Sequence, residues 1–295
     1  MEARGRLDVT RRTNVQAFVS RDYSQESRSA IDANAAGDRA NVTADTVGAT
    51  LNHRFNRLSL QLRGTVGEYD YSDVMVGTTM QSNADRDYRA YDGAVRASWE
   101  FKPTLTGFVE VGGNQRDYAA VDQFDGISRD SKGERYRVGA QFGEQSQILR
   151  GEVSVGYGVQ RPDDGRLQSI EGILIDANVA WRATQLTTLS FNASSDVSET
   201  TTAGSGGVFR RSFGVEARHA FQRRLIGTAG ITYMMQNYEG VDLDENEWRG
   251  DLGLEYFMSR EVVMFGRYRH TVFNSTSPNA DYTSDAFHVG LRLRR

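Results

Sequence analysis

The sequence contains no cysteine, only three prolines and no long apolar run. Without cysteine the chain has no disulfide framework, no thiol nucleophile and no thiolate metal site. No apolar segment approaches the roughly 18 residues that a transmembrane helix needs, which excludes a helical membrane protein. Lysine is also scarce, because Lys102 and Lys132 are the only lysines among 35 basic residues. Nearly all positive charge is therefore guanidinium, which suits fixed, hydrogen-bonded positions.

The apolar fraction is low for a chain of this length. It is 38% over 295 residues, and the mean hydropathy is -0.56, which is too little for a large conventional core. Aromatic residues make up 10% and the net charge is only -4, so the composition argues against disorder. The acidic balance and the lack of a basic stripe also disfavour nucleic-acid binding. One large β architecture fits these totals better than two ordinary domains.

A hairpin pattern repeats along the whole chain. Two arms of alternating apolar and polar residues flank a short turn, which recurs about every 37 to 47 residues. These turns lie at Arg11-Arg12, Asn56-Arg57, Lys102-Pro103, Gln145-Ser146, Ala183-Thr184, Arg223 and Ser259-Arg260. Longer polar segments separate the hairpins at about 25–40, 72–86, 119–133, 162–169, 199–207, 239–246 and 275–284. Short turns at one end and long loops at the other require strands that run up and down in sequence.

The alternating arms predict fourteen strands, most of them longer than the usual five or six residues of globular strands. Nine to eleven tilted residues are enough to cross hydrocarbon, so these arms are long enough to span a membrane. The expected strands lie near 14–24, 41–55, 58–71, 88–101, 104–118, 134–144, 148–161, 170–182, 186–198, 208–221, 225–238, 247–258, 262–274 and 285–294.

Each strand has one apolar and one polar face, as the segment 88–101 illustrates. Val95 and Trp99 share one face, while Arg96 and Glu100 share the other. A soluble protein turns the apolar face to a core, whereas a membrane barrel turns it to lipid. Strand length and sorted loop lengths favour the barrel, and so do two aromatic belts, which we interpret as interfacial girdles. The belt near the turns contains Phe55, Trp99, Phe101, Phe142, Trp181, Phe221, Tyr256 and Phe257, and the belt near the loops contains Tyr69, Tyr71, Tyr88, Tyr118, Tyr157, Tyr238 and Trp248.

Several hairpin segments resemble a known family. They are GRLDVTRRTNVQAF, HRFNRLSLQLRG, RDSKGERYRVG, LRGEVSVGYG, WRATQLTTLSFNAS and the closing alternating strand. Together they resemble the putative β-barrel porin-2 family of proteobacterial outer-membrane proteins, which are often encoded near genes for polysaccharide synthesis and export. The resemblance implies an outer-membrane location in a Gram-negative bacterium, contact with membrane lipid, and a polysaccharide-export machinery as partner on the periplasmic side.

The two ends of the chain depart from the usual pattern of such barrels. The last strand ends LRLRR rather than in an aromatic residue. The first residues, GRLDVT, read as the tail of a strand entering a turn, so residues 1–13 are interpreted as the remnant of a preceding strand and periplasmic turn. We expect a single domain over 1–295 that lacks a signal peptide and some strands of a barrel of sixteen to eighteen. Barrels of that size leave an aqueous lumen.

No constellation of residues predicts catalysis, a cofactor or a metal. His53, His219, His270 and His288 lie in different strands without ligand spacing, and the first three fall on the apolar face. The glycine-rich segment GSGG at 204–207 is expected to be flexible. The acidic segments 128–134 and 240–247 favour solvated loops over calcium sites, because their oxygen-ligand spacing follows no recognised loop.

The polar face itself is the candidate site. Its acids and arginines would project into one lumen, where they could select hydrated polar solutes, or pair with one another and brace the wall. The candidate pore-lining residues are Arg63, Arg96, Glu100, Glu110, Arg116, Arg137, Arg150, Glu152, Arg182, Glu216, Arg218, Arg249, Asp251, Glu255, Arg267 and Arg292.

Three functions are compatible with this pattern. The leading hypothesis is an outer-membrane channel for polar solutes, with an exported polysaccharide as the cargo that the family resemblance implies. The second is a non-conducting barrel that anchors partner-binding or glycan-binding loops at the surface. The third is a soluble carbohydrate-binding β protein, which would remain in solution without detergent and would reverse the orientation of both faces.

Overall fold

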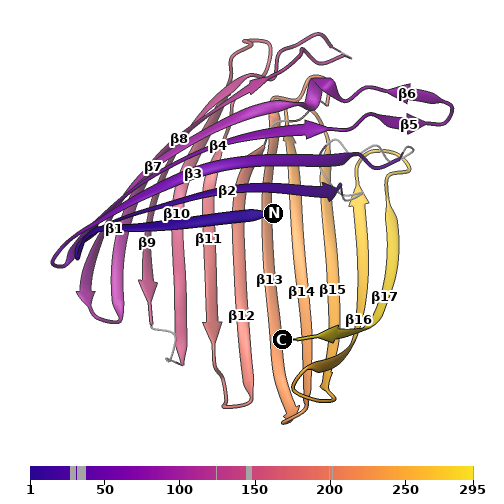
Figure 1. Cartoon of the computed structure of the whole chain (residues 1–295). Helices are drawn as coiled ribbons and strands as arrows, with labels where there is room; N and C mark the ends of the chain where they lie inside the picture. The colour runs from indigo at the N-terminus through magenta and orange to yellow at the C-terminus, as the bar shows by residue number, and fades with distance from the viewer. Residues whose placement is uncertain are drawn as a thin grey trace.

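The computed structural model describes residues 1–26, 31, 38–123, 125–143, 148–198, 200 and 202–294. Its main element is a 15-stranded antiparallel sheet in which the strands follow one another in chain order (Figure 1). The strands are β1 (Glu2–Thr10), β2 (Thr13–Gln25), β3 (Asn41–Phe55), β4 (Leu58–Tyr71), β7 (Tyr88–Lys102), β8 (Leu105–Tyr118), β9 (Ser131–Phe142), β10 (Leu149–Pro162), β11 (Ile170–Trp181), β12 (Thr187–Ser198), β13 (Gly207–Gln222), β14 (Leu225–Glu239), β15 (Asp244–Phe257), β16 (Val262–Ser275) and β17 (Tyr282–Leu293).

The fourteen predicted strands are all present, and residues ahead of the first turn form β1. The loop after β4 adds a small hairpin of β5 (Val74–Val76) and β6 (Thr79–Gln81), followed by the 3-10 helix η1 (Ala84–Arg86). Among the predicted short turns, Gln145-Ser146 lies outside the described residues, as do parts of the long segments 25–40 and 199–207. The up-and-down, all-β architecture expected from the alternation is therefore confirmed.

The register fixes which side chains share a face. Val95 pairs with Leu62 and Val111, while its neighbour Arg96 pairs with Gln61 and Glu110. Paired residues point to the same side of a sheet, so in this part of the sheet the apolar and the polar side chains lie on opposite faces. The apolar side is open: more than half of the surface of Leu62 and of Val95 is exposed.

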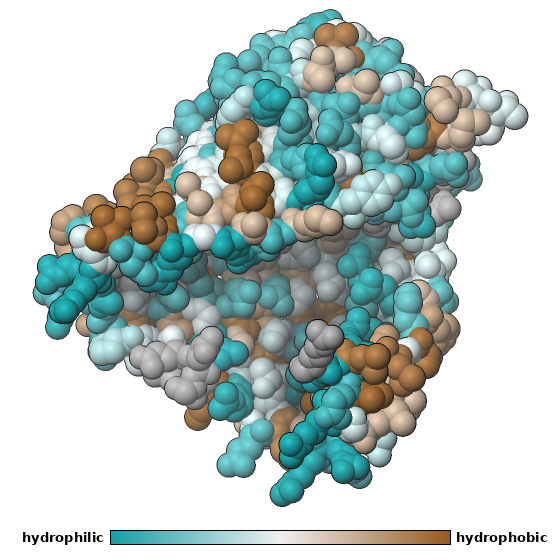
Figure 2. Space-filling view, viewed as in Figure 1, coloured by the Kyte–Doolittle hydropathy of each residue, from teal (hydrophilic) through white to brown (hydrophobic). Residues whose placement is uncertain are grey.

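The polar side is the concave one. Arg96 of β7 reaches Glu152 of β10 across two intervening strands, which side chains can do only on the inside of a curved sheet. Figure 2 shows the hollow on this side, with hydrophobic patches on the outer surface near the short turns and around β17. The buried apolar cluster of the described residues is small, consisting of Ile170, Leu174 and Phe209. The sheet is thus built as a barrel wall with an apolar exterior.

The sheet has two edges, β1 and β17, which no ladder joins within the described residues. The neighbouring strands curl so that β1 to β4 arch over the hollow, β9 to β15 form its back, and β16 and β17 close its right side (Figure 1). No helix among the described residues is long and apolar enough to cross a membrane.

The aromatic belt near the turns lies mostly on the convex face, but the belt near the loops was predicted wrongly. Tyr69, Tyr88 and Tyr118 occupy paired concave positions and stack on one another, with ring centroids 4.6 and 5.2 Å apart. Tyr71 and Tyr238 share this concave phase. In the predicted loop-side belt, Tyr157 and Trp248 point to the convex face. In the turn-side belt, Phe257 points to the concave face.

Close packing on the concave face leaves no room for a side chain at Gly139 of β9. A Cβ atom there would lie 2.4 Å from both the Phe108 ring and the Val153 carbonyl oxygen. We expect Gly139→Ala to lower the free energy of unfolding by about 1–3 kcal/mol, as overpacking does, measured by denaturant unfolding in detergent micelles. Gly266→Ala on β16 is the control, because nothing lies within 4 Å of its Cβ position. Equal losses in the two variants would contradict this packing argument.

Asp87 and Asp164, both in loops, have oppositely shifted pKa values. Burial raises the pKa of Asp87, nearby carboxylates add to the shift, and the hydrogen bond from the Tyr71 backbone N–H opposes it. The side-chain and backbone hydrogen bonds from Arg166 lower the pKa of Asp164 to about 2. Raising the folded-state pKa costs stability at neutral pH, and this cost disappears as the pH falls through that value. The lowered folded-state pKa of Asp164 contributes stability at neutral pH, and this stability is lost as the pH falls from about 4 to about 2.

The two substitutions to asparagine should therefore change the neutral-pH melting temperature in opposite directions. Asp87→Asn keeps an oxygen that accepts from the Tyr71 backbone N–H and removes a partly buried charge, so we expect a higher melting temperature at neutral pH. The gain should shrink as the pH falls from the raised pKa of Asp87 towards the ordinary aspartate value of 3.8, because the native carboxyl then becomes neutral as well. Asp164→Asn should lower the melting temperature at neutral pH. Shifts of the same sign in both variants would refute these assignments.

Candidate functional site: the concave wall

The structure brings the predicted pore-lining residues together on the concave face. All except Arg182 lie within strands and share the concave phase, and Arg182 follows the end of β11 by one residue. They are Arg63, Arg96, Glu100, Glu110, Arg116, Arg137, Arg150, Glu152, Glu216, Arg218, Arg249, Asp251, Glu255, Arg267 and Arg292. Their placement on one face is observed, whereas their role in lining a conducting pore stays a prediction.

One ion pair spans four strands of the wall. The Arg96 guanidinium donates to both carboxylate oxygens of Glu152, at 2.9 and 2.7 Å, and lies 3.4 Å from the centroid of the Phe108 ring. A bidentate pair of this kind has a fixed geometry as well as favourable energy. It ties β7 to β10 and so supports the curvature of the sheet.

Glu110 is the centre of a second cluster on the same part of the wall. Its carboxylate is 5% exposed and lies 3.5 Å from Arg63, 3.8 Å from Arg137 and 4.0 Å from Arg135. A buried carboxylate needs such partners, because an unpaired charge there would be costly. This cluster shows that part of the predicted pore lining braces the wall through mutual pairing.

Further members of this network were missed by the sequence analysis. Arg135 bonds both oxygens of Asp92 at 2.6 and 2.8 Å, Arg137 lies 3.2 Å from Asp176, and Arg54 pairs with Glu100. These residues sit in the same concave phase as the predicted ones. The alternation alone would have identified them, had every polar position of each strand been counted.

The wall from β13 to β17 is also charged. Glu255 lies 3.6 Å from Arg218 and 3.2 Å from Arg292, and Asp251 lies 2.7 Å from Arg269. These contacts join side chains on different strands across the concave face. Both halves of the wall therefore carry arginines and acids in mixed rows.

Two polar cavities open from the concave face, and Glu152 lines both. The first, the turn-side cavity, has a volume of about 450 Å³ and lies near the short turns. The second, the hydroxyl cavity, has a volume of about 420 Å³. The turn-side cavity is lined by residues that include Arg12, Asn14, Asn52, Arg54, Arg57, Gln61, Arg96 and Gln141, and the hydroxyl cavity by residues that include Ser154, Asp176, Asn178, Asn192, Ser194, Ser212 and Thr232. A larger hollow of about 700 Å³ lies on the convex face, where Val19, Val47 and Val66 line it together with the charged side chains of Arg21, Asp45, Glu68 and Arg89.

A row of side-chain amides forms one wall of the turn-side cavity. Asn52 donates to Asn14 at 3.1 Å, and Gln61 donates to Asn52 at 2.9 Å. The row crosses β2, β3 and β4 and ends beside Arg96, which pairs with Gln61 in register. Each amide has two donors and two acceptor lone pairs, so groups remain for a solute after these bonds are made.

The loop-side half of β12 leaves the wall and enters the interior. The ladder with β11 ends at Ala177 and Ala193, and beyond it the Ser195 hydroxyl bonds the backbone N–H and C=O of Ile175. Further along, the carbonyl of Val197 accepts a hydrogen bond from Arg116 of β8 at 3.2 Å. β12 therefore narrows the loop-side end of the hollow.

An apolar contact accompanies this inward displacement. Val197 and Phe209 belong to the convex phase, yet they pack against Ile170 and Leu174, which belong to the concave phase of β11. Such a contact is possible because the loop-side parts of β12 and β13 lie over the concave face of β11. The small apolar cluster thus holds the narrowed end in place.

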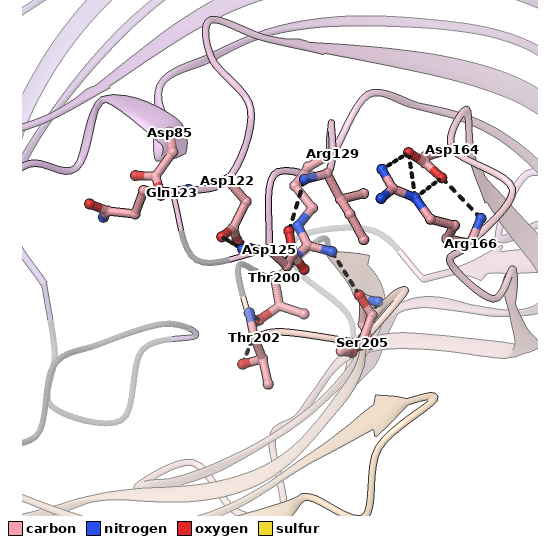
Figure 3. Close-up of polar contacts among 12 residues, drawn as sticks. Asp85, Asp122, Gln123, Asp125, Arg129, Asp164, Arg166, Thr200, Thr202 and Ser205 are labelled. Carbon is pink, nitrogen blue, oxygen red and sulfur yellow. Dashed lines mark hydrogen bonds and ion pairs between the residues drawn. The ribbon is translucent and has the colours of Figure 1, made fainter.

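The loop between β8 and β9 is fastened at the same end (Figure 3). Arg129 is 2% exposed and donates to Asp122 at 3.1 Å, to Asp125 at 2.7 Å and to the carbonyl of Ser205 at 3.2 Å. Ser205 is fully buried in the GSGG segment, where a Cβ on Gly206 would lie 1.9 Å from a backbone oxygen. The expectations of a flexible GSGG segment and a solvated 128–134 segment are therefore corrected in part: GSGG is packed, and Arg129 of the second segment is buried and donates a hydrogen bond to the Ser205 carbonyl, while Lys132 and Glu134 stay exposed.

The histidines do not form a metal centre. His53 and His219 lie on the convex face near the turns, each with its Nδ1 atom 2.8 Å from a threonine hydroxyl. His270 has an acidic neighbour that its sequence surroundings do not show, because Asp285 lies 2.8 Å away across the β16–β17 pair. No group of three or more His, Asp or Glu side chains suited to a metal occurs in the part of the chain that the structure describes.

Solved structures of outer-membrane proteins share this fold. The FrpB iron transporter from Neisseria meningitidis matches with a TM-score of 0.57 and 10% identity, over 94% of this chain and 52% of that one. The alcaligin outer-membrane receptor FauA from Bordetella pertussis matches with a TM-score of 0.51 and 14% identity, over 97% and 55%. The ferric citrate transporter FecA matches with a TM-score of 0.53 and 9% identity, over 94% and 51%.

At these identities the likeness shows the fold alone. The chain spans about half the length of the solved structures it matches. No curated protein matches the sequence.

The family comparison covers the whole chain. The sequence model of the family described as putative β-barrel porin 2 matches residues 1–295. This agrees with the up-and-down sheet, its apolar convex face and its charged concave face. Together with the outer-membrane neighbours, it points to the outer membrane of a Gram-negative bacterium. The chain belongs to the putative β-barrel porin 2 family.

Proposed function

We propose that this chain forms the wall of a passive channel for polar solutes across the outer membrane. The observation that carries the proposal is the concave face, which presents acids, arginines, amides and hydroxyls over strands β2 to β17. Charged side chains lining a wide pore select hydrated solutes without catalysis. The mixed rows of opposite charge provide such a lining, while their mutual pairing keeps it rigid.

The proposed cargo is a polysaccharide in export. The amide row at Asn14, Asn52 and Gln61, together with the hydroxyl cavity, offers many donors and acceptors at neutral groups. Such groups match the hydroxyls of a sugar chain, which exchange bonds easily as the chain moves. The family resemblance supports the same cargo, and a polysaccharide-export machinery would then be the periplasmic partner.

A second candidate is a non-conducting anchor whose loops bind a partner or glycan. The specific observation in its favour is the narrowed loop-side end, where β12 turns inward and Arg129 fastens two loops. In that case the concave charges would serve only to brace the wall. The two candidates differ in whether ions pass.

Planar-bilayer recording on the full-length protein separates these candidates. The channel predicts stepwise ion conductance, because the polar lining holds water across the membrane. A variant with the 119–130 loop shortened should conduct at least as well, since that loop lies at the narrowed end. Absence of conductance in both proteins, with native β structure retained, would sink the channel and favour the anchor.

Arg129 should control both the stability and the opening of the loop-side end. Arg129→Met leaves the buried Asp122 and the partly buried Asp125 without a cation, so we expect a loss of about 3–5 kcal/mol in the free energy of unfolding. In recordings we expect larger or longer open levels, because the tie to Ser205 is lost. The control is Arg166→Met, which removes an arginine from an exposed pair with Asp164. Equal effects of the two substitutions would show that the Arg129 contacts do not fasten this end.

A further inference from the structure

Charge is sorted along the strand axis, although the net charge is only -4. Among the described residues, every charged side chain in a short turn or within two positions of one is basic, except Glu100 and Glu261. The sequence adds Glu144 in the turn that lies outside the described residues. We call this band the basic collar. The opposite end is acidic: in the described loop segments the basic residues are Arg39, Arg86, Arg129 and Arg166, among a larger number of aspartates and glutamates.

Two arginines of the basic collar lie at the opening of the turn-side cavity, which we call the mouth, without an acidic partner among the described residues. Arg12 and Arg57 are exposed, line the turn-side cavity, and have no carboxylate contact among the described residues. Their neighbour Arg54 is held in place, because its Nε donates to the carbonyl of Asn56 at 2.9 Å and its Nη2 bonds Glu100. The mouth therefore carries positive charge that the protein does not neutralise.

The cavity behind these arginines limits what can bind there. Its volume of about 450 Å³ falls within the roughly 300–1,000 Å³ of small-molecule sites. A short segment of a linear polymer can enter such a space, whereas a folded acidic protein cannot. The amide row of Asn14, Asn52 and Gln61 then lies next to any group held by the arginines.

We propose that the turn-side cavity is a binding site for the acidic sugar units of an anionic saccharide. Arg12 and Arg57 bind the carboxylate or sulfate, since a guanidinium fork matches such groups bidentately. The amide row bonds the hydroxyls of the same or the next ring. This inference rests on the proposed channel, because it makes an anionic saccharide the cargo.

The charge difference between the two ends of the strands favours entry of an anionic polymer from one side of the membrane. Short turns of outer-membrane barrels face the periplasm, so the basic collar attracts a polyanion from that side. The acidic loop end repels the same polymer from outside. The two ends together favour entry from the periplasm over return from the exterior.

The site is tested by calorimetric binding to the full-length protein in detergent, with trigalacturonate as the acidic probe and maltotriose as the neutral one. We expect trigalacturonate to bind more tightly and to weaken as salt is raised. The double variant Arg12→Gln, Arg57→Gln should lose about tenfold in affinity for trigalacturonate, as removal of charge-assisted bonds does. Its affinity for maltotriose should not change.

The matched control is the double variant Arg223→Gln, Arg224→Gln, which removes the same charge from the basic collar at a turn outside the cavity. It should keep most of the affinity. Equal losses in the two double variants, or equal binding of the two sugars by the native protein, would overturn the site. Calorimetry measures binding independently of ion conductance. A protein that conducts ions but does not bind trigalacturonate therefore refutes this site alone. A protein that binds without conducting refutes the channel and leaves the site standing.

Discussion

In the hydrocarbon of a membrane every peptide N–H and C=O has to find a protein partner, and this constraint organises the whole molecule. Long antiparallel ladders meet it, such as the pairing of β13 with β14 from Gly207 and Glu239 to Gln222 and Leu225. Once those ladders are set, every side chain is assigned to one face, because a slip of one residue would exchange the two faces. The apolar exterior and the charged interior are both consequences of that pairing.

Most of the fold follows from local alternation and could be predicted from it. The faces of Val95 and Arg96 are opposite in any extended chain, so their environments were assigned before any contact was known. The prediction of a loop-side aromatic belt was wrong because its members were chosen by their distance from a loop and not by the face of the strand to which they point. Tyr69, Tyr88 and Tyr118 are on the concave side by the same alternation that placed Arg96 there.

The parts that could not be predicted depend on segments far apart in the chain. Arg129 meets Ser205, which is 76 residues away, and Arg116 meets Val197, which is 81 residues away. No period or motif announces such contacts, because they arise only after the sheet has curved. The same holds for Glu110, whose three arginine neighbours come from two other strands. Alternation identified the charged face, and curvature decided which charges became partners.

The seam between β11 and β12 also limits where lipid can lie. Beyond Ala177 and Ala193, the described residues show a serine hydroxyl rather than a ladder linking the two strands. Peptide groups without ladder partners have to remain in water or against polar atoms. Contact with acyl chains beside this seam is therefore limited to the turn-side part of the two strands, whereas an unbroken pair such as β15 and β16 can meet hydrocarbon along its whole ladder.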